Sequence, residues 1–193
     1  MKKTILIYLV GASLFVSTTT PISAQPPKSD PDAAIAVIQK MLASIRLKKF
    51  DHALTYIHID EIAKFLTGQH YKKFSPSQKQ QLNRLLGDYI KIRAFPLAVK
   101  YIGDVGLTYD RPVTKNGKFY LKSSVVYSSK ERIVFSWVLQ EYQESLLITD
   151  FIDIENKSSM TKSRDQQVLP SLNKRGIKGF LENFEKVVNK LKS

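Results

Sequence analysis

Histidine and aspartate are the residue types in this chain with the clearest potential for metal binding or acid–base catalysis. The chain contains three histidines, His52, His58 and His70, and the aspartates Asp51 and Asp60 lie close to two of them. Their spacing does not match His-Glu-x-x-His or another common metal-ligand pattern. We therefore predict structural or surface roles for the histidines, helix-end roles for the two aspartates, and no metal site.

Other motifs of catalysis and phosphate binding are also missing. The sequence has no Gly-x-Ser-x-Gly nucleophile motif, no Gly-x-Gly-x-x-Gly and no phosphate loop, and its nearest glycine cluster, 103–106, fits the entry to a strand. It has no Cys, which excludes disulfides and thiolate metal sites. We predict a protein that is not an enzyme and needs no cofactor. An exported hydrolase or isomerase with Asp150 or a histidine as base remains an alternative.

The N-terminus has the pattern of a secretory signal peptide. Lys2 and Lys3 precede an apolar and small-residue run at 5–16, and small residues end at Ala24. The run is shorter than the roughly 20 residues of a membrane-spanning helix, which disfavours an uncleaved anchor. No Cys follows that could be acylated. We predict a signal peptide at 1–24 and a single exported, periplasmic domain at 25–193.

The chain is strongly basic, with a formal net charge of +13, of which the predicted mature domain would keep +11 after loss of Lys2 and Lys3. Export argues against nucleic acid as a partner, which leaves anionic lipid headgroups, acidic protein surfaces or simple solubility. Basic residues cluster at four places: Arg46-Lys48-Lys49, Lys72-Lys73, Lys91-Arg93 and Lys174-Arg175-Lys178.

The elements that would position any site are centred on 131–154. Ile133, Phe135, Trp137 and Leu139 alternate with more polar residues, which predicts a strand with one apolar face. After a short polar break, 146–154 predicts a second, antiparallel strand in which Ile148, Ile152 and Ile154 share a phase.

Two more strands are predicted upstream, at 105–109 and 119–127, with a hairpin turn at Asn116-Gly117. Helices are predicted before and after this sheet of about four strands along the chain. The first opens at Asp30-Pro31, shorter pieces follow at 51–66, and the capping box of 75–78 starts a long helix that Pro96 should kink or end. The C-terminal helical region is divided by Gly176. The fold class is therefore α+β.

Two segments carry a family resemblance. Residues 68–78, Gly-Gln-His-Tyr-Lys-Lys-Phe-Ser-Pro-Ser-Gln, resemble a glycine, aromatic, Ser-Pro and Gln segment of MlaC-type proteins, the toluene-tolerance family. Asp150, the serines at 158–159, Arg164 and the run 176–181, Gly-Ile-Lys-Gly-Phe-Leu, are similar to that family's strand, turn and helix entry. The resemblance spans about 50–191 in order.

The resemblance implies a periplasmic phospholipid-binding shuttle. Such a protein exchanges lipid between an outer-membrane lipoprotein complex and the lipid-binding subunit of an inner-membrane ABC transporter, and so maintains the lipid asymmetry of the outer membrane. It also implies a twisted antiparallel sheet and helices that enclose an apolar cavity. A hopanoid-associated carrier of the same family is an alternative.

Lipid-lining residues follow from the resemblance together with the apolar stripes. Periodicity alone does not separate a cavity from a filled core, so a structural adaptor with no cavity also remains open. The predicted lining comes from the long helix, the central strand and the last helix: Leu82, Leu86, Tyr89, Ile90, Phe95, Phe135, Trp137, Leu139, Ile177, Phe180, Leu181 and Phe184.

Overall fold

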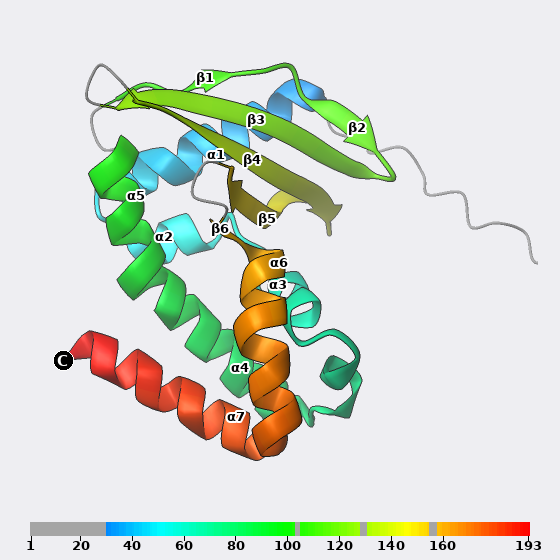
Figure 1. The fold of residues 1–193 in the computed structure, drawn as a ribbon. Coiled ribbons are helices and arrows are strands. Elements are labelled where there is room, and N and C mark those ends of the chain that lie inside the picture. Colours follow the sequence, from blue (N-terminus) through cyan, green and yellow to red (C-terminus); the bar gives the residue numbers. More distant parts are fainter. Residues whose placement is uncertain (1–29, 103–104, 128–130, 155–157) are drawn as a thin grey trace, which may run out of the picture.

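A computed structural model describes residues 30–102, 105–127, 131–154 and 158–193. The predicted signal peptide and its cleavage site lie outside the described residues. Figure 1 shows a twisted sheet at one end of the molecule, with helices beneath it and a second group of helices extending away from it. The predicted α+β class is confirmed.

The sheet is antiparallel and larger than the predicted set of about four strands. The order is β1-β3-β4-β5-β6, and β2 pairs with β3 beside β1. The long central strands are the predicted ones, while two short strands were not foreseen. The strands are β1 (Thr108–Tyr109), β2 (Val113–Lys115), β3 (Lys118–Tyr127), β4 (Glu131–Tyr142), β5 (Ser145–Asp153) and β6 (Ser158–Ser159).

Tight turns set the register of the sheet. Asn116 and Gly117 both have positive φ, at 52° and 71°, as a two-residue hairpin turn requires. This turn joins β2 to β3. A second two-residue turn, Gln143-Glu144, joins β4 to β5 with φ of 45° and 66°.

A bulge in β5 changes which residues face the helices. Val138 pairs with Asp150 but Leu139 pairs with Ile148, so Thr149 is an extra residue. Its hydroxyl donates to the Val138 carbonyl at 3.3 Å. Because of this insertion Phe151, opposite Trp137, shares a face with Ile148. The prediction that Ile148 and the later isoleucines stay in phase is therefore wrong.

The helices surround one face of the sheet and then extend away from it. They are α1 (Pro31–Arg46), α2 (Phe50–Leu54), α3 (Ile59–Thr67), η1 (Gly68–Lys73), α4 (Pro76–Tyr89), η2 (Ile90–Ala94), α5 (Phe95–Ile102), α6 (Met160–Ser163), η3 (Arg164–Val168) and α7 (Leu169–Lys192).

The predicted helix starts are confirmed by their caps. The Asp30 side chain accepts the Asp32 N–H at 3.0 Å, and Ser75 and Gln78 form a reciprocal capping box. Gly176, with φ 64° and ψ 179°, interrupts α7 as predicted.

Pro96 does not end the long helical run, which continues through it to Ile102. Instead, η2 is a five-residue π-helical turn, in which the Phe95 N–H bonds to the Ile90 carbonyl, and α5 continues from Phe95. The same arrangement recurs before Pro170, where η3 joins α6 to α7. The wider π-helical turn leaves room for the proline ring and accommodates the absence of the backbone hydrogen bond that proline cannot donate.

The interior consists of two hydrophobic clusters. The sheet cluster packs β3, β4 and β5 against α1, α2 and α5, and the helical cluster joins α3, η1, α4 and α7. Ile57 and Ile90 pack against both clusters, which places them at the boundary.

Candidate functional site

The residues predicted to line a lipid cavity are divided between the two clusters. Phe95, Phe135, Trp137 and Leu139 belong to the sheet cluster, and Ile90 contacts both. The others are in the helical cluster: Leu82, Leu86, Tyr89, Ile177, Phe180, Leu181 and Phe184. The structure therefore divides them between two adjoining groups, which do not form one continuous wall.

An aromatic group lies on the helix-facing side of the sheet. The Trp137 and Phe151 ring centroids are 4.6 Å apart, and those of Phe135 and Phe151 are 5.3 Å apart. Trp137 is buried, and its indole Nε1 donates to the Ser123 hydroxyl at 2.8 Å. Phe151 is 38% exposed, so this group reaches the surface. The sequence did not identify Phe151, because only the bulge at Thr149 puts it opposite Trp137.

A second aromatic group joins α4 to α7. The Tyr89 and Phe184 ring centroids are 6.0 Å apart, and those of Phe180 and Phe184 are 6.1 Å apart. Tyr89 and Phe184 are only half-buried, unlike Phe180. These rings offer incompletely covered apolar surface.

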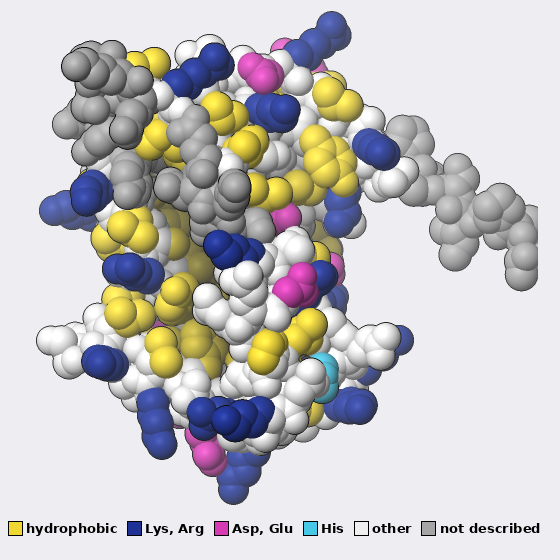
Figure 2. Space-filling view, viewed as in Figure 1, with side chains coloured by type: hydrophobic (Ala, Val, Ile, Leu, Met, Phe, Trp, Pro, Cys, Tyr) yellow, Lys and Arg dark blue, Asp and Glu magenta, His cyan; other side chains and the backbone are white. Residues whose placement is uncertain are grey.

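The surface is hollowed between the two halves. Figure 2 shows hydrophobic side chains at the floor of a hollow beneath the sheet, between the α4–α5 run and α6. Elements on both sides carry half-buried apolar side chains, including Ile92 of η2, Ala98 of α5, Met160 of α6 and Val168 of η3. Such a concave apolar surface suits a hydrophobic ligand.

Two further cavities run along α1, away from the predicted lining. The larger, of about 510 Å³, is lined by residues that include Asp32, Ile35 and Tyr109, and the smaller, of about 180 Å³, lies beside Leu42 and Tyr109. None of the predicted lining residues borders either cavity. Burial raises the pKa of Tyr109, which lies between them. No sequence motif pointed to this groove, because it depends on how the segment before β2 packs against α1.

A polar network at the helical cluster ties α3, η1 and α4 together. The Asp60 carboxylate accepts hydrogen bonds from the Tyr71 hydroxyl and from Asn83 Nδ2, the latter at 3.1 Å, and pairs with Lys64 at 3.0 Å. Lys79 lies 4.8 Å from the centre of the Tyr71 ring. Tyr71 belongs to the segment 68–78 that carried the family resemblance.

The network perturbs both acidic groups. Burial opposes ionisation of Asp60, but the hydrogen bonds from Tyr71, Asn83 and Lys64 outweigh it and lower the Asp60 pKa to about 2. Burial, together with the bond to Asp60, raises the pKa of Tyr71 to about 12. Asp60 was predicted to be only a helix-end residue, and its role as the centre of this network was missed.

Each of the three histidines contacts a partner of its own. His58 caps α3 through Nδ1, which accepts the Glu61 N–H at 3.3 Å, while His52 contacts Tyr56 and His70 contacts Asn173. Among the described residues no group of three or more His, Cys, Asp or Glu could hold a metal ion.

Asp150 lies in β5 opposite Val138, on the sheet face away from the helices. Burial raises the pKa of its carboxyl group, although the Phe151 N–H, which donates to the carboxylate at 2.7 Å, has the opposite effect. A carboxyl group on that face does not border the hollow.

Of the helices that the structure describes, none is long and apolar enough to cross a bilayer.

Comparison with known proteins gives one family and one fold. The family model described as MlaC protein matches residues 32–186. Among solved structures, the fold is similar to that of the phospholipid-binding protein from Ralstonia solanacearum in complex with a phospholipid, with a TM-score of 0.72, 12% sequence identity, and coverage of 86% of this chain and 100% of that chain. No significant match to a curated protein was found.

Proposed function

The chain belongs to the MlaC family, whose model covers residues 32–186, and from this premise we propose that it is a carrier that binds phospholipid. The observation that carries the proposal is the division of the interior into two hydrophobic clusters with a hollow at their boundary. The similar fold of the Ralstonia protein, which was solved with a phospholipid, supports it.

The physical requirement for a carrier is the cost of exposing acyl chains to water. Burial of an acyl chain is worth roughly 0.8 kcal/mol per CH₂ group, so a chain of ordinary length resists transfer to water by on the order of 10 kcal/mol. Two adjoining apolar groups can replace the membrane around such a chain. We propose that the predicted lining residues, together with Phe151, form this surface.

We further propose that the protein acts in the periplasm after removal of residues 1–24. It would receive lipid at an outer-membrane lipoprotein complex and deliver it to an inner-membrane ABC transporter, or carry it in the opposite direction. These roles follow from the family resemblance. The alternative within the same family is a carrier of hopanoids, which we would expect in a host whose membranes contain them.

We propose that the protein is not an enzyme. The three histidines each have a local structural partner, and Asp150 lies on the other side of the sheet from the aromatic group. A hydrolase or isomerase would require an acid or base beside the apolar hollow. Replacement of Asp150 by Asn should therefore leave lipid binding unchanged.

Native mass spectrometry tests the proposal. The full precursor is expressed in a Gram-negative host, the periplasmic protein is purified without detergent, and the bound mass is measured before and after denaturation. We expect a stoichiometric phospholipid that denaturation releases. A protein that is empty, and that also extracts no lipid from vesicles, would instead favour the adaptor or the enzyme.

A further inference from the structure

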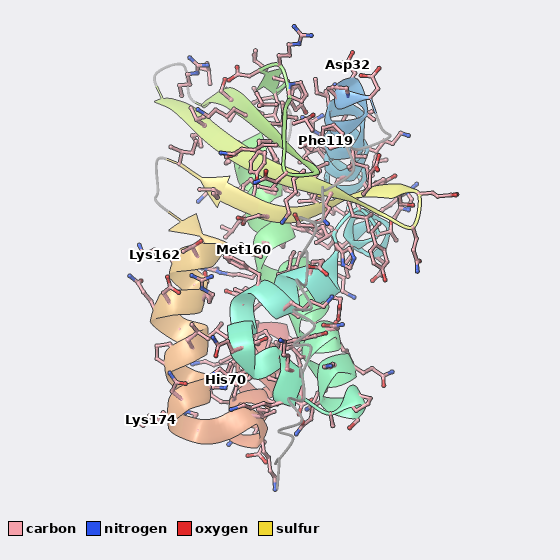
Figure 3. The ribbon with its side chains drawn as sticks, turned by 90° about the vertical axis from the view of Figure 1, so that its right-hand side faces the viewer. Asp32, His70, Phe119, Met160, Lys162 and Lys174 are labelled. Carbon is pink, nitrogen blue, oxygen red and sulfur yellow. The ribbon has the colours of Figure 1, made fainter. Side chains whose placement is uncertain are left out.

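Two basic segments that are about 100 residues apart in the sequence meet at one end of the molecule. One segment ends η1, and the other flanks the interruption of α7 at Gly176. Figures 1 and 3 place this end of the helical half farthest from the sheet. We define the basic kink surface as the side chains of Lys72, Lys73, Lys174, Arg175 and Lys178.

A direct contact fixes the two segments beside each other. His70 Nε2 and Asn173 Oδ1 lie 3.0 Å apart, which links η1 to the first part of α7. Figure 3 shows His70 and Lys174 close to this end, with Phe119 of the sheet at the other. The charges on the two elements therefore act together on whatever approaches this end.

The positive charge of the basic kink surface is not neutralised within the described residues. All its side chains are exposed, and none forms an ion pair there. Even Glu182, one helical turn beyond Lys178, makes no such pair. By contrast, Arg84 of α4 pairs with Glu185, and Lys192 at the end of α7 pairs with Asp88.

The basic kink surface also lacks an apolar anchor. The large hydrophobic side chains that are exposed in the described parts of the chain belong to other segments, such as Leu97, Phe151, Val187 and Leu191. Protein interfaces concentrate their binding energy in buried aromatic and arginine anchors and are depleted in lysine. A surface dominated by lysine without such anchors fits a diffuse negative charge better than a protein partner.

We propose that the basic kink surface docks this protein reversibly on anionic phospholipid bilayers. Long, mobile lysine side chains meet headgroup phosphates without requiring a shaped partner. Each charge held near an anionic membrane surface contributes roughly a fivefold gain in affinity. This docking is separate from cargo binding in the hollow, because the basic kink surface contains none of the proposed lining residues.

Vesicle flotation tests the proposal. The full-length mature protein is mixed with vesicles of phosphatidylcholine alone or of an equimolar mixture with phosphatidylglycerol. We expect binding only to the anionic vesicles, with steep weakening as salt rises and the Debye length shortens from about 10 Å at 0.1 M to about 3 Å at 1 M. Substitution of the whole basic kink surface by Gln should lower the partition coefficient by more than about 100-fold.

A charge-matched variant provides the control. It carries Gln in place of other exposed basic residues for which the described parts of the chain provide no ion pair: Lys40, Lys115, Lys122, Lys186 and Lys190. It should retain most of the binding. Equal loss in both variants would mean that net charge alone is responsible and would overturn the proposal.

Two further results would also overturn it. One is failure of the unsubstituted protein to bind anionic vesicles. The other is loss of capture by solubilised membrane proteins in the basic kink variant while vesicle binding is unchanged, which would make the surface a protein interface. Unchanged lipid occupancy by native mass spectrometry would show that the variant is folded and that cargo binding is a separate property.

Discussion

Trp137 combines a large hydrophobic ring with a single polar atom that needs a partner inside the protein. That partner is Ser123, whose side chain is almost inaccessible and whose hydroxyl accepts the indole N–H at 2.8 Å. The two residues lie diagonally across neighbouring strands, since Ser123 pairs with Phe135. The hydrogen bond fixes the orientation of the indole against Phe151.

Trp137→Phe should therefore destabilise the sheet. The variant loses the hydrogen bond and leaves the buried Ser123 hydroxyl without its partner, which costs about 1–3 kcal/mol in free energy of unfolding. Urea denaturation measures the change. Adding Ser123→Ala should recover part of the loss, because the two residues act as a pair. Strictly additive effects of the two substitutions would contradict the role given to this bond.

Asp60 makes stability depend on acid pH. Its folded pKa is about 2, below the unfolded value of about 3.9, so the folded state favours the ionised carboxylate. The stabilisation is complete above about pH 4 and is lost as pH falls through about 2. Because the Asp60 side chain is 38% exposed, solvent screening reduces the contribution to about 1 kcal/mol.

Asp60→Asn should lower the free energy of unfolding by about that amount at pH 7. The difference from the unsubstituted protein should shrink at about pH 2, where the native carboxyl is itself partly protonated. Urea titrations of both proteins at the two pH values measure this. A stability difference between the two proteins that is the same at both pH values would show that the Asp60 charge does not cause it.

At the level of elements, the π-helical turn η2 keeps one apolar stripe continuous through the long helix. Leu82, Leu86 and Ile90 follow at intervals of four, and Phe95 comes five residues after Ile90, so an ordinary α-helix would place Phe95 about 140° around the helix axis from Ile90. The extra residue in η2 restores the phase. It also moves the carbonyl groups that the ring of Pro96 would otherwise strike.

A deletion cycle tests this explanation. Removal of the exposed Arg93 shortens the spacing from Ile90 to Phe95 to four residues but places the proline in a regular helix. This should lower the free energy of unfolding by about 3 kcal/mol. Pro96→Ala should recover most of that loss in the shortened chain, yet change the full-length protein by less than about 1 kcal/mol. Chemical denaturation of the four proteins gives the coupling. Equal effects of Pro96→Ala in both backgrounds would argue against the role of the π-turn.

For the whole molecule, local patterns predicted the elements better than their relations. The caps at Asp30 and Ser75 and the alternation in β4 are set by neighbouring residues, so the sequence was sufficient for them. The bulge at Thr149 reverses the faces of β5 and is decided by pairing with β4. Periodicity likewise identified the apolar faces. It did not show that Phe95 and Phe184 would enter different clusters.

Phe151 offers the most direct test of cargo binding by the assembled molecule. It contacts Trp137 on the helix-facing side of the sheet, and at 38% exposure it tolerates substitution better than Trp137, which is 4% exposed. Phe151→Glu places a charge on the proposed lipid surface, where an unpaired carboxylate is costly beside an acyl chain. We expect loss of copurifying phospholipid, at least tenfold by native mass spectrometry, since about 1.4 kcal/mol gives that factor.

The matched control is Val126→Glu in β3, which is 57% exposed and pairs with Arg132 on the opposite face of the sheet. It adds the same charge to the same sheet but should retain phospholipid. Thermal unfolding of both variants separates loss of cargo from loss of fold. Equal occupancy in the two folded variants would exclude the aromatic group of β4 and β5 from the lining. The cargo would then have to lie elsewhere, and the groove between α1 and Tyr109 would become the next site to test.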